Sequence, residues 1–418
     1  MIVTRDRVEF GARERLKQIA YLLRWTALGA IAGVLAGTAS AVFLISLKWV
    51  TAAFADHSWL LFALPVAGLM VGLAYHYGGG RSVEGNNLII GEIHDPQAWV
   101  PRRMAPMVLL GTLASHLGGA SVGREGTAIQ MGGSLTDLAS RLLRLKPSDR
   151  RMMLIAAIAG GFGSVFGVPL AGAVFALEVQ AVGRVRYDAL VPALAASVIG
   201  DMVVSGFGVH HMATPDLGKV SLTIELILKV ALAGIAFGLA SVAFTGSVER
   251  VKALFEKRVA WAPLRPFIGG ACLIAMTLVV GSRMYNGLSL GLIELGLTGS
   301  EVPTWGFLIK LVFTAVALGA GFIGGEVTPL FVIGATLGAT LAGLLGVPVP
   351  LLAALGFVAV FAGAANTPLA CTIMGVELFG SGALPYFAIA CVFSYVFSSH
   401  RGLYRTQLLG SSKLPQAP

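Results

Sequence analysis

The sequence carries little charge for its length. Only 12% of its 418 residues are charged, whereas 56% are hydrophobic. A soluble domain is about 25% charged, and half that fraction cannot cover the surface of a globular protein of this size. The composition excludes an ordinary soluble protein and, with a mean hydropathy of +0.82, predicts a polytopic membrane protein.

Residues that usually hold metals or perform catalysis are also scarce. The three cysteines lie in apolar sequence, which is typical of small core residues and argues against a disulfide framework. The seven histidines show no H-x-x-H or His/Cys spacing, so we predict no metal site and no cofactor. The chain lacks a His-Glu-x-x-His helix and a Gly-x-Ser-x-Gly segment, which leaves an intramembrane enzyme as a minor alternative.

Long apolar runs are present, but several are shorter than the roughly 20 residues that a straight membrane crossing needs. Short helices interrupted by glycine are tolerated in a membrane only where protein or an aqueous cavity shields the backbone. With 54 glycines and 18 prolines, the chain is predicted to be all-α, with many tilted and broken helices. The main candidate segments are 25–47, 59–73, 153–177, 222–244, 307–322 and 385–397.

Basic residues outnumber acidic ones, giving a net charge of +9. They gather in the N-terminal segment 1–24, in 141–151, in 250–265 and near the C-terminus. We interpret these clusters as the positive charge that flanks membrane helices on the cytoplasmic side, not as a nucleic-acid surface. The N-terminus is therefore expected in the cytoplasm, and no cleavable signal peptide is expected before the first helix.

Three segments of the first half resemble three of the second half, in the same order and at similar spacing. They are REGTAIQMGGSL (124–135) with EVTPLFVIGATL (326–337), VPLAGAVFALE (168–178) with TPLACTIMGVE (367–377), and, more weakly, EGNNLIIGEI (84–93) with NGLSLGLIEL (286–295). This order predicts a duplicated unit, as in transporters built from repeats. The repeats span 25–212 and 217–407, between the segment 1–24 and a C-terminal tail, 408–418.

Three of these segments place glycine directly before an apolar helical run: VEGNNLI, VGREGTA and GGEVTPLF. A helix start presents unpaired N–H groups and about half a positive charge. Several starts aimed at one point form an anion site without a full cation. Glu125 lies at one of them, where a charge in the membrane costs several kcal/mol unless it is compensated. We predict that its carboxylate is held there and that a transported anion displaces it.

The segments GREGT, GGEVTP and GLYRTQ, with FALE and its repeat MGVE, resemble the signature segments of the CLC family of anion channels and anion/proton antiporters. The resemblance spans about residues 25–407. It implies a CLC-type fold of two inverted-topology repeats. It also implies a homodimer with one complete pathway in each subunit.

Departures from the chloride-transporting members resemble the bacterial fluoride/proton antiporter branch of the family. The chain has VEGNN at 83–87 where those members have Gly-Ser-Gly-Ile-Pro, and Thr127 where they have proline. It also has GGEVTP at 324–329 where they have Gly-Gly-x-Phe-x-Pro.

The resemblance implies roles for three residues. Glu125 is the gating glutamate, which blocks the anion path when ionised and carries a proton when neutral; a salt bridge to Arg124 is the structural alternative. Tyr404 matches the pore tyrosine, whose hydroxyl donates to the anion; alone, it would be interpreted as an interfacial aromatic residue. Asn86 supplies an amide beside the central site, although it also fits a helix N-cap.

The remaining candidates belong to the same helix starts. Gly85 and Gly126 leave their backbone open to the anion, and Thr328 adds a hydroxyl. Val327 replaces a family phenylalanine and leaves room for Glu125 to swing inward. Glu326 is either a helix-dipole partner or a proton relay. The relay would be needed because Val179 stands where chloride/proton members often carry an inner glutamate.

Three further acidic residues are Glu84, Glu178 and Glu377. Glu84 replaces a serine donor of the family, and we expect it to be protonated or turned toward Arg81. Glu178 and Glu377 occupy equivalent places in the repeats and are predicted to be structural hydrogen-bond acceptors.

The function that this resemblance implies is a fluoride/proton antiporter that exports fluoride from the cytoplasm. The runner-up is a chloride/proton antiporter or a chloride channel of the same family. Either protein would be a multi-pass protein of the inner cell membrane, with ions and lipid as partners.

Overall fold

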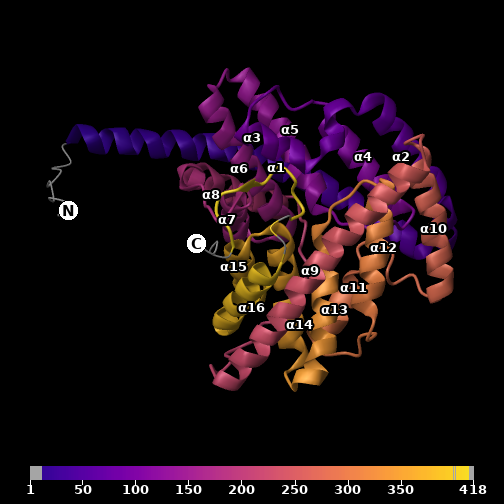
Figure 1. Ribbon diagram of the computed structural model, residues 1–418. Coiled ribbons are helices and arrows are strands. Elements are labelled where there is room, and N and C mark those ends of the chain that lie inside the picture. Colours follow the sequence, from indigo (N-terminus) through magenta and orange to yellow (C-terminus); the bar gives the residue numbers. More distant parts are fainter. Residues whose placement is uncertain (1–11, 399, 401, 414–418) are drawn as a thin grey trace.

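The computed structural model describes residues 12–398, 400 and 402–413. The first half of the chain contributes eight of the α-helices in these residues (Figure 1). They are α1 (Ala12–Asp56), α2 (Leu64–Gly78), α3 (Asn86–His94), α4 (Met104–Leu117), α5 (Glu125–Leu142), α6 (Pro147–Phe166), α7 (Pro169–Glu178) and α8 (Leu190–Gly206). Short 3-10 turns precede α2, α3 and α8: η1 (Ser58–Ala63), η2 (Gly80–Glu84) and η3 (Tyr187–Ala189).

The second half of the described chain repeats this arrangement with eight more α-helices. They are α9 (Ile224–Arg258), α10 (Leu264–Val280), α11 (Leu290–Thr298), α12 (Gly306–Ala320), α13 (Val327–Leu345), α14 (Val349–Ala365), α15 (Pro368–Phe379) and α16 (Leu384–Phe397), with η4 (Ser381–Ala383) before α16. The C-terminal segment then runs back to the first half (Figure 1). There β2 (Leu408–Leu409) pairs in parallel with β1 (Ala181–Val182).

Helix length agrees with the prediction of a membrane protein with many short helices. Among the described residues, five helical segments are long and apolar enough to cross a membrane: Glu14–Asp56, Ser58–Gly78, Tyr187–Gly206, Ile224–Arg258 and Val327–Leu345. Other apolar helices have 10–17 residues. These short helices pack inside the protein, where neighbouring helices shield their ends.

The continuous hydropathy of the run 153–177 suggested one helix, but the structure shows that the run is not one helix. Gly167 ends α6 in the left-handed region, with φ of 71°, where a residue with a Cβ would be strained. Pro169 then opens α7 at a position where its missing N–H is not needed. The run therefore forms two helices separated by a sharp turn.

Two glutamates join the repeats reciprocally. Glu178, at the end of α7, accepts hydrogen bonds from Leu369 N at 3.1 Å and Ala370 N at 2.8 Å, in the first turn of α15. Glu377, near the end of α15, accepts from Leu170 N at 2.9 Å and Ala171 N at 2.7 Å, in the first turn of α7. The prediction that both acids are structural acceptors is confirmed.

This reciprocity relates the two helices by an approximate two-fold axis, and the division of the chain into repeats 25–212 and 217–407 stays a prediction. Of the N-terminal segment 1–24, residues 12–24 are the first turns of α1, which extends away from the body in Figure 1, and residues 1–11 lie outside the described residues. Of the tail 408–418, residues 414–418 also lie outside them.

Candidate functional site

Glu125 is the fully buried acid at the first position of α5, and its carboxylate points at the start of α13. Oε2 accepts a hydrogen bond from Thr328 N at 3.1 Å and from Arg124 N at 3.1 Å, and Oε1 accepts from the Thr328 hydroxyl. Thr328 N is one of the N–H groups that a helix start leaves unpaired. The carboxylate thus occupies the place of an anion at a helix N-terminus.

The Arg124 side chain is a weaker partner of this carboxylate. Its Nε lies 3.9 Å from Glu125 Oε1 and forms no hydrogen bond with the described residues, while the guanidinium lies 5.9 Å from the centre of the Phe166 ring. Backbone and hydroxyl donors therefore hold Glu125 more directly than the salt bridge that was the structural alternative.

Two glycines form the cradle around the carboxylate. Gly123 and Gly325 precede the starts of α5 and α13, and they exchange backbone hydrogen bonds of 2.6 and 2.8 Å. A Cβ at either glycine would lie within 2.7 or 2.8 Å of Glu125 Oε2. Only glycine at both places lets the two helix starts approach each other with the carboxylate between them.

Openings lie on both sides of this cradle. A cavity of about 900 Å³, which we call the large cavity, reaches Gly85, Asn86, Glu326 and Tyr404. A pocket of about 30 Å³, the small pocket, is lined by residues that include Arg124, Thr328 and His211. Glu125 contacts Thr328 of the small pocket, and the residue after it, Gly126, abuts Asn86 of the large cavity. Glu125 therefore lies between a residue that lines the small pocket and residues that line the large cavity.

Asn86 brings a side-chain amide to this boundary. The side chain is 8% exposed, its Oδ1 has no hydrogen-bond partner among the described residues, and its Nδ2 would lie 3.0 Å from a Cβ at Gly126. Gly85 is the N-cap of α3, so the alternative that Asn86 is the N-cap is wrong. The unpaired Oδ1 is an acceptor, so it can receive a hydrogen bond from water or from a protonated group in the cavity.

Gln130 is a site residue that the sequence analysis missed. It lies on α5 one turn beyond Gly126, is 9% exposed and lines the large cavity. Its Nε2 would lie 3.4 Å from a Cβ at Gly85, so a second amide stands beside the start of α3. The spacing of Gln130 from Gly126 could have identified it from the sequence. Residues four apart share one face of a helix, and Gly126 was already a candidate.

The other predicted residues lie around the same point. Tyr404 is 5% exposed and lines the large cavity, which places it inside the protein and not in an interfacial belt. Val327 is 1% exposed at the first position of α13. Glu326 precedes it, partly buried, and also lines the large cavity. The structure brings Glu125, Gly126, Asn86 and Thr328 into direct contact, with Tyr404 and Glu326 on the cavity wall.

The expectation that Glu84 turns toward Arg81 is wrong. Arg81 instead forms an ion pair with Glu92, which is 1% exposed at the far end of α3. Glu84 is exposed and lines the large cavity, where water can solvate its charge. Glu92 is buried and takes its compensating charge from Arg81 together with Arg150, whereas the exposed Glu84 carboxylate needs no such partner.

Among the described residues, no group of three or more His, Cys, Asp or Glu side chains is placed to hold a metal ion. The site offers N–H groups, hydroxyls and amides, which are donors suited to an anion. It also contains the buried carboxylate of Glu125, which is held at the start of α13.

Residues 67–399 match the family model described as voltage gated chloride channel. The chain is 49% identical to a protein of Pseudomonas syringae pv. tomato named chloride/fluoride channel protein, over 97% of this chain and 91% of that one. It is 26% identical to the H(+)/Cl(-) exchange transporter ClcA of Yersinia pestis, over 84% and 79% of the two chains. The crystal structure of a CLC-type fluoride/proton antiporter superposes with a TM-score of 0.90 at 33% identity, covering 93% of this chain and 98% of that one. The protein belongs to the voltage-gated chloride channel family, the CLC family.

Proposed function

We propose that this CLC protein is a fluoride/proton antiporter that exports fluoride from the cytoplasm in exchange for protons. The observation that carries the proposal is the position of the Glu125 carboxylate, which lies at the start of α13 between the two openings. A relative at 49% identity is named for chloride and fluoride, and the structure with a TM-score of 0.90 is that of a fluoride/proton antiporter.

Glu125 is the gate in this proposal. While ionised, it fills the helix start and closes the route between the large cavity and the small pocket. A proton that arrives through the small pocket neutralises the carboxylate and weakens its hold on the Thr328 N–H and hydroxyl. The neutral side chain leaves, the anion takes its donors, and the proton is released toward the large cavity.

The donors favour fluoride over chloride. Fluoride is the smaller and more tightly hydrated ion, so a site that removes its water needs numerous short hydrogen bonds. Asn86 and Gln130 add two amides and Thr328 adds a hydroxyl around the route. Val327 is smaller than the family phenylalanine, which leaves Glu125 room to turn toward the large cavity.

Glu326 is the proposed proton relay on the inner side. It precedes the α13 start that holds the Glu125 carboxylate, and it lines the large cavity. Val179 cannot carry a proton, so Glu326 or cavity water must complete the route.

A chloride/proton antiporter or a channel is the second candidate, because one relative is named a chloride/fluoride channel and another a proton/chloride exchanger. Flux from liposomes containing the purified protein separates these functions, with fluoride, chloride and pH electrodes recording together. The proposal requires fluoride release coupled to proton uptake, with chloride release much slower.

The gate is tested in the same assay with Glu125→Gln, which keeps the shape of the side chain and cannot ionise. We expect proton movement to stop and fluoride turnover to fall by at least a factor of about 100, since general acid–base steps contribute roughly 10²–10⁴. Glu294→Gln, at an exposed position of α11, is the matched control. Coupled transport that persists in Glu125→Gln would refute the role of the gate.

A further inference from the structure

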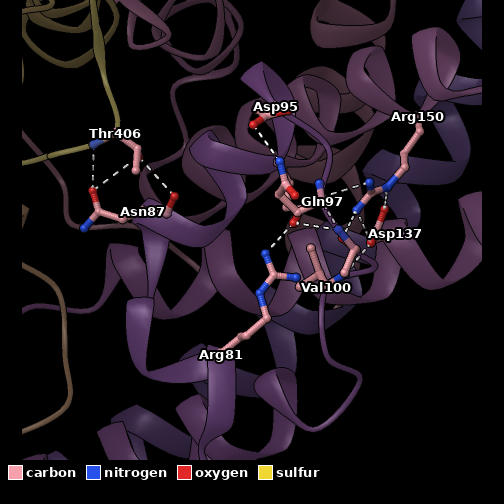
Figure 2. Close-up of polar contacts among 10 residues, drawn as sticks. Arg81, Asn87, Asp95, Gln97, Val100, Asp137, Arg150 and Thr406 are labelled. Carbon is pink, nitrogen blue, oxygen red and sulfur yellow. Dashed lines mark hydrogen bonds and ion pairs between the residues drawn. The ribbon is translucent and has the colours of Figure 1, made fainter.

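A pair of residues joins the start of α3 to the segment that carries Tyr404. Thr406 donates from its hydroxyl to the Asn87 carbonyl oxygen at 3.0 Å, and from its backbone N–H to Asn87 Oδ1 at 3.3 Å (Figure 2). The hydroxyl also lies 3.4 Å from Asn87 Oδ1. The Thr406 methyl packs over Gly91, where a Cβ would lie 3.7 Å away. The hydroxyl and the backbone N–H of Thr406 thus both bind Asn87.

The two partners are the immediate neighbours of the residues that line the anion route. Asn87 follows Asn86 on α3, and Thr406 lies two residues after Tyr404. All four line the large cavity. The Asn87–Thr406 pair consequently connects the wall of the large cavity that carries the Asn86 amide to the wall that carries the Tyr404 phenol.

Each wall is also anchored at a point away from the pair. In the segment 402–413, Leu403 N donates to Ala364 O at 2.9 Å, and Leu408 N donates to Gln180 O at 3.2 Å. These bonds hold the segment to α14 and to the first repeat on either side of Thr406. Loss of the Thr406 hydroxyl would thus leave the segment folded.

At the far end of α3, a buried charge network provides the second anchor (Figure 2). Glu92 accepts from Arg150 Nη1 at 3.1 Å and pairs with Arg81. Arg150 in turn binds Asp137 through Nε at 2.6 Å and Nη2 at 2.9 Å. This network fixes the far end of α3 to α5 and α6, whereas the Asn87–Thr406 pair ties the start of the helix to the segment 402–413.

We propose that Asn87 and Thr406 are positioning residues that set the distance between Asn86 and Tyr404 and so determine which anion the inner part of the route accepts. The proposal rests on the proposed function for the anion route itself. A small anion needs donors from both walls at once, whereas a larger one can use walls that are further apart. Without the pair, the walls move more freely, and fluoride loses more than chloride.

Thr406→Val tests the pair, since valine keeps the shape and removes the hydroxyl. We expect the ratio of fluoride to chloride release from liposomes to fall by about fivefold, the effect of losing one net hydrogen bond. Thr406→Ser restores the hydroxyl and should restore most of the ratio. Asn87→Leu removes the Oδ1 acceptor but leaves the carbonyl, so it should produce a smaller fall in the same direction. Thr298→Val, at an exposed hydroxyl that bonds to the end of its own helix, is the matched control.

The unfolding temperature in detergent, measured for each variant, separates positioning from simple loss of folding. An unchanged ratio in a folded Thr406→Val would overturn the proposal, as would an equal fall in the serine and valine variants. Should Thr406→Val fail to fold, Asn87→Leu decides by the same criterion. The wild-type protein tests the proposed function separately: if it prefers chloride, that function fails, and the pair is still judged by whether the ratio shifts.

Discussion

Thr328 presents both of its polar groups to the gate, which makes it the residue on which occupancy of the helix start most directly depends. Its backbone N–H would remain in any variant, but its hydroxyl is supplied by the side chain alone. In the proposed mechanism, the same hydroxyl becomes available to the anion once Glu125 has left. A single side chain would then bind two competing ligands at one place.

Thr328→Val removes this hydroxyl and keeps the branched shape in a position that is 2% exposed. We expect fluoride turnover to fall by about 10- to 150-fold, because a hydrogen bond to a charged group contributes roughly 1.5–3 kcal/mol. Electrode-recorded flux from liposomes measures the change. Thr328→Ser should retain most of the activity, and equal activity of the valine and wild-type proteins would contradict a role for the hydroxyl.

At the scale of helices, Glu178 and Glu377 accept hydrogen bonds from the first turns of α15 and α7. These contacts should contribute to the stability of the fold and not to transport. Replacing either acid by glutamine turns one acceptor oxygen into an NH₂ group that faces backbone N–H donors. We expect Glu178→Gln and Glu377→Gln each to lower the free energy of unfolding by about 1–3 kcal/mol. Thermal unfolding in detergent measures this, and their two-fold relation predicts similar losses. Glu294→Gln is the exposed control; unchanged unfolding temperatures in both cap variants would contradict the assignment.

The elements that carry the site were predictable because their signals are local. Glycine before an apolar run predicted helix starts within VEGNNLI, VGREGTA and GGEVTPLF, and α3, α5 and α13 begin inside these segments. The break between α6 and α7 was missed because hydropathy is continuous across it, although the Gly-Val-Pro sequence at 167–169 carried the turn signal.

Contacts between distant residues were not predictable in this way. Gly123 and Gly325 are 202 residues apart, and nothing in either segment alone shows that they exchange hydrogen bonds. The repeat predicts that the two positions are equivalent, but not that they touch. The same limit applies to Asn87 with Thr406 and to Glu92 with Arg150, because pairing of remote polar groups depends on how the helices pack.

For the whole molecule, three basic clusters lie near one face. Arg24 of α1 binds Asp149 at 2.5 Å, which places the N-terminal part of the chain beside the cluster 141–151. Arg150 of that cluster is linked through Glu92 to Arg81, next to the mouth of the large cavity. The third cluster contributes Lys252 and Arg265 to the same cavity. From the positive-inside rule we expect this face to lie in the cytoplasm and the small pocket to lie on the opposite side.

Labelling of single cysteines with a membrane-impermeant maleimide tests this orientation. The background is Cys272→Ser, since Cys272 is exposed and the other two cysteines are buried. Lys252→Cys should react in inverted vesicles and not in spheroplasts. Lys219→Cys, exposed on the connection between the repeats that also carries His211 of the small pocket, should react only in spheroplasts.

Both positions are exposed, so lack of reaction reports the side of the membrane and not burial; labelling after detergent solubilisation is the control. The opposite pattern would place the large cavity outside. In that case fluoride leaving the cytoplasm would meet Glu125 through the small pocket first, and the proton would have to reach the gate past Glu326. The direction of labelling thus decides which opening supplies the anion and which supplies the proton, because Glu125 lies between the two.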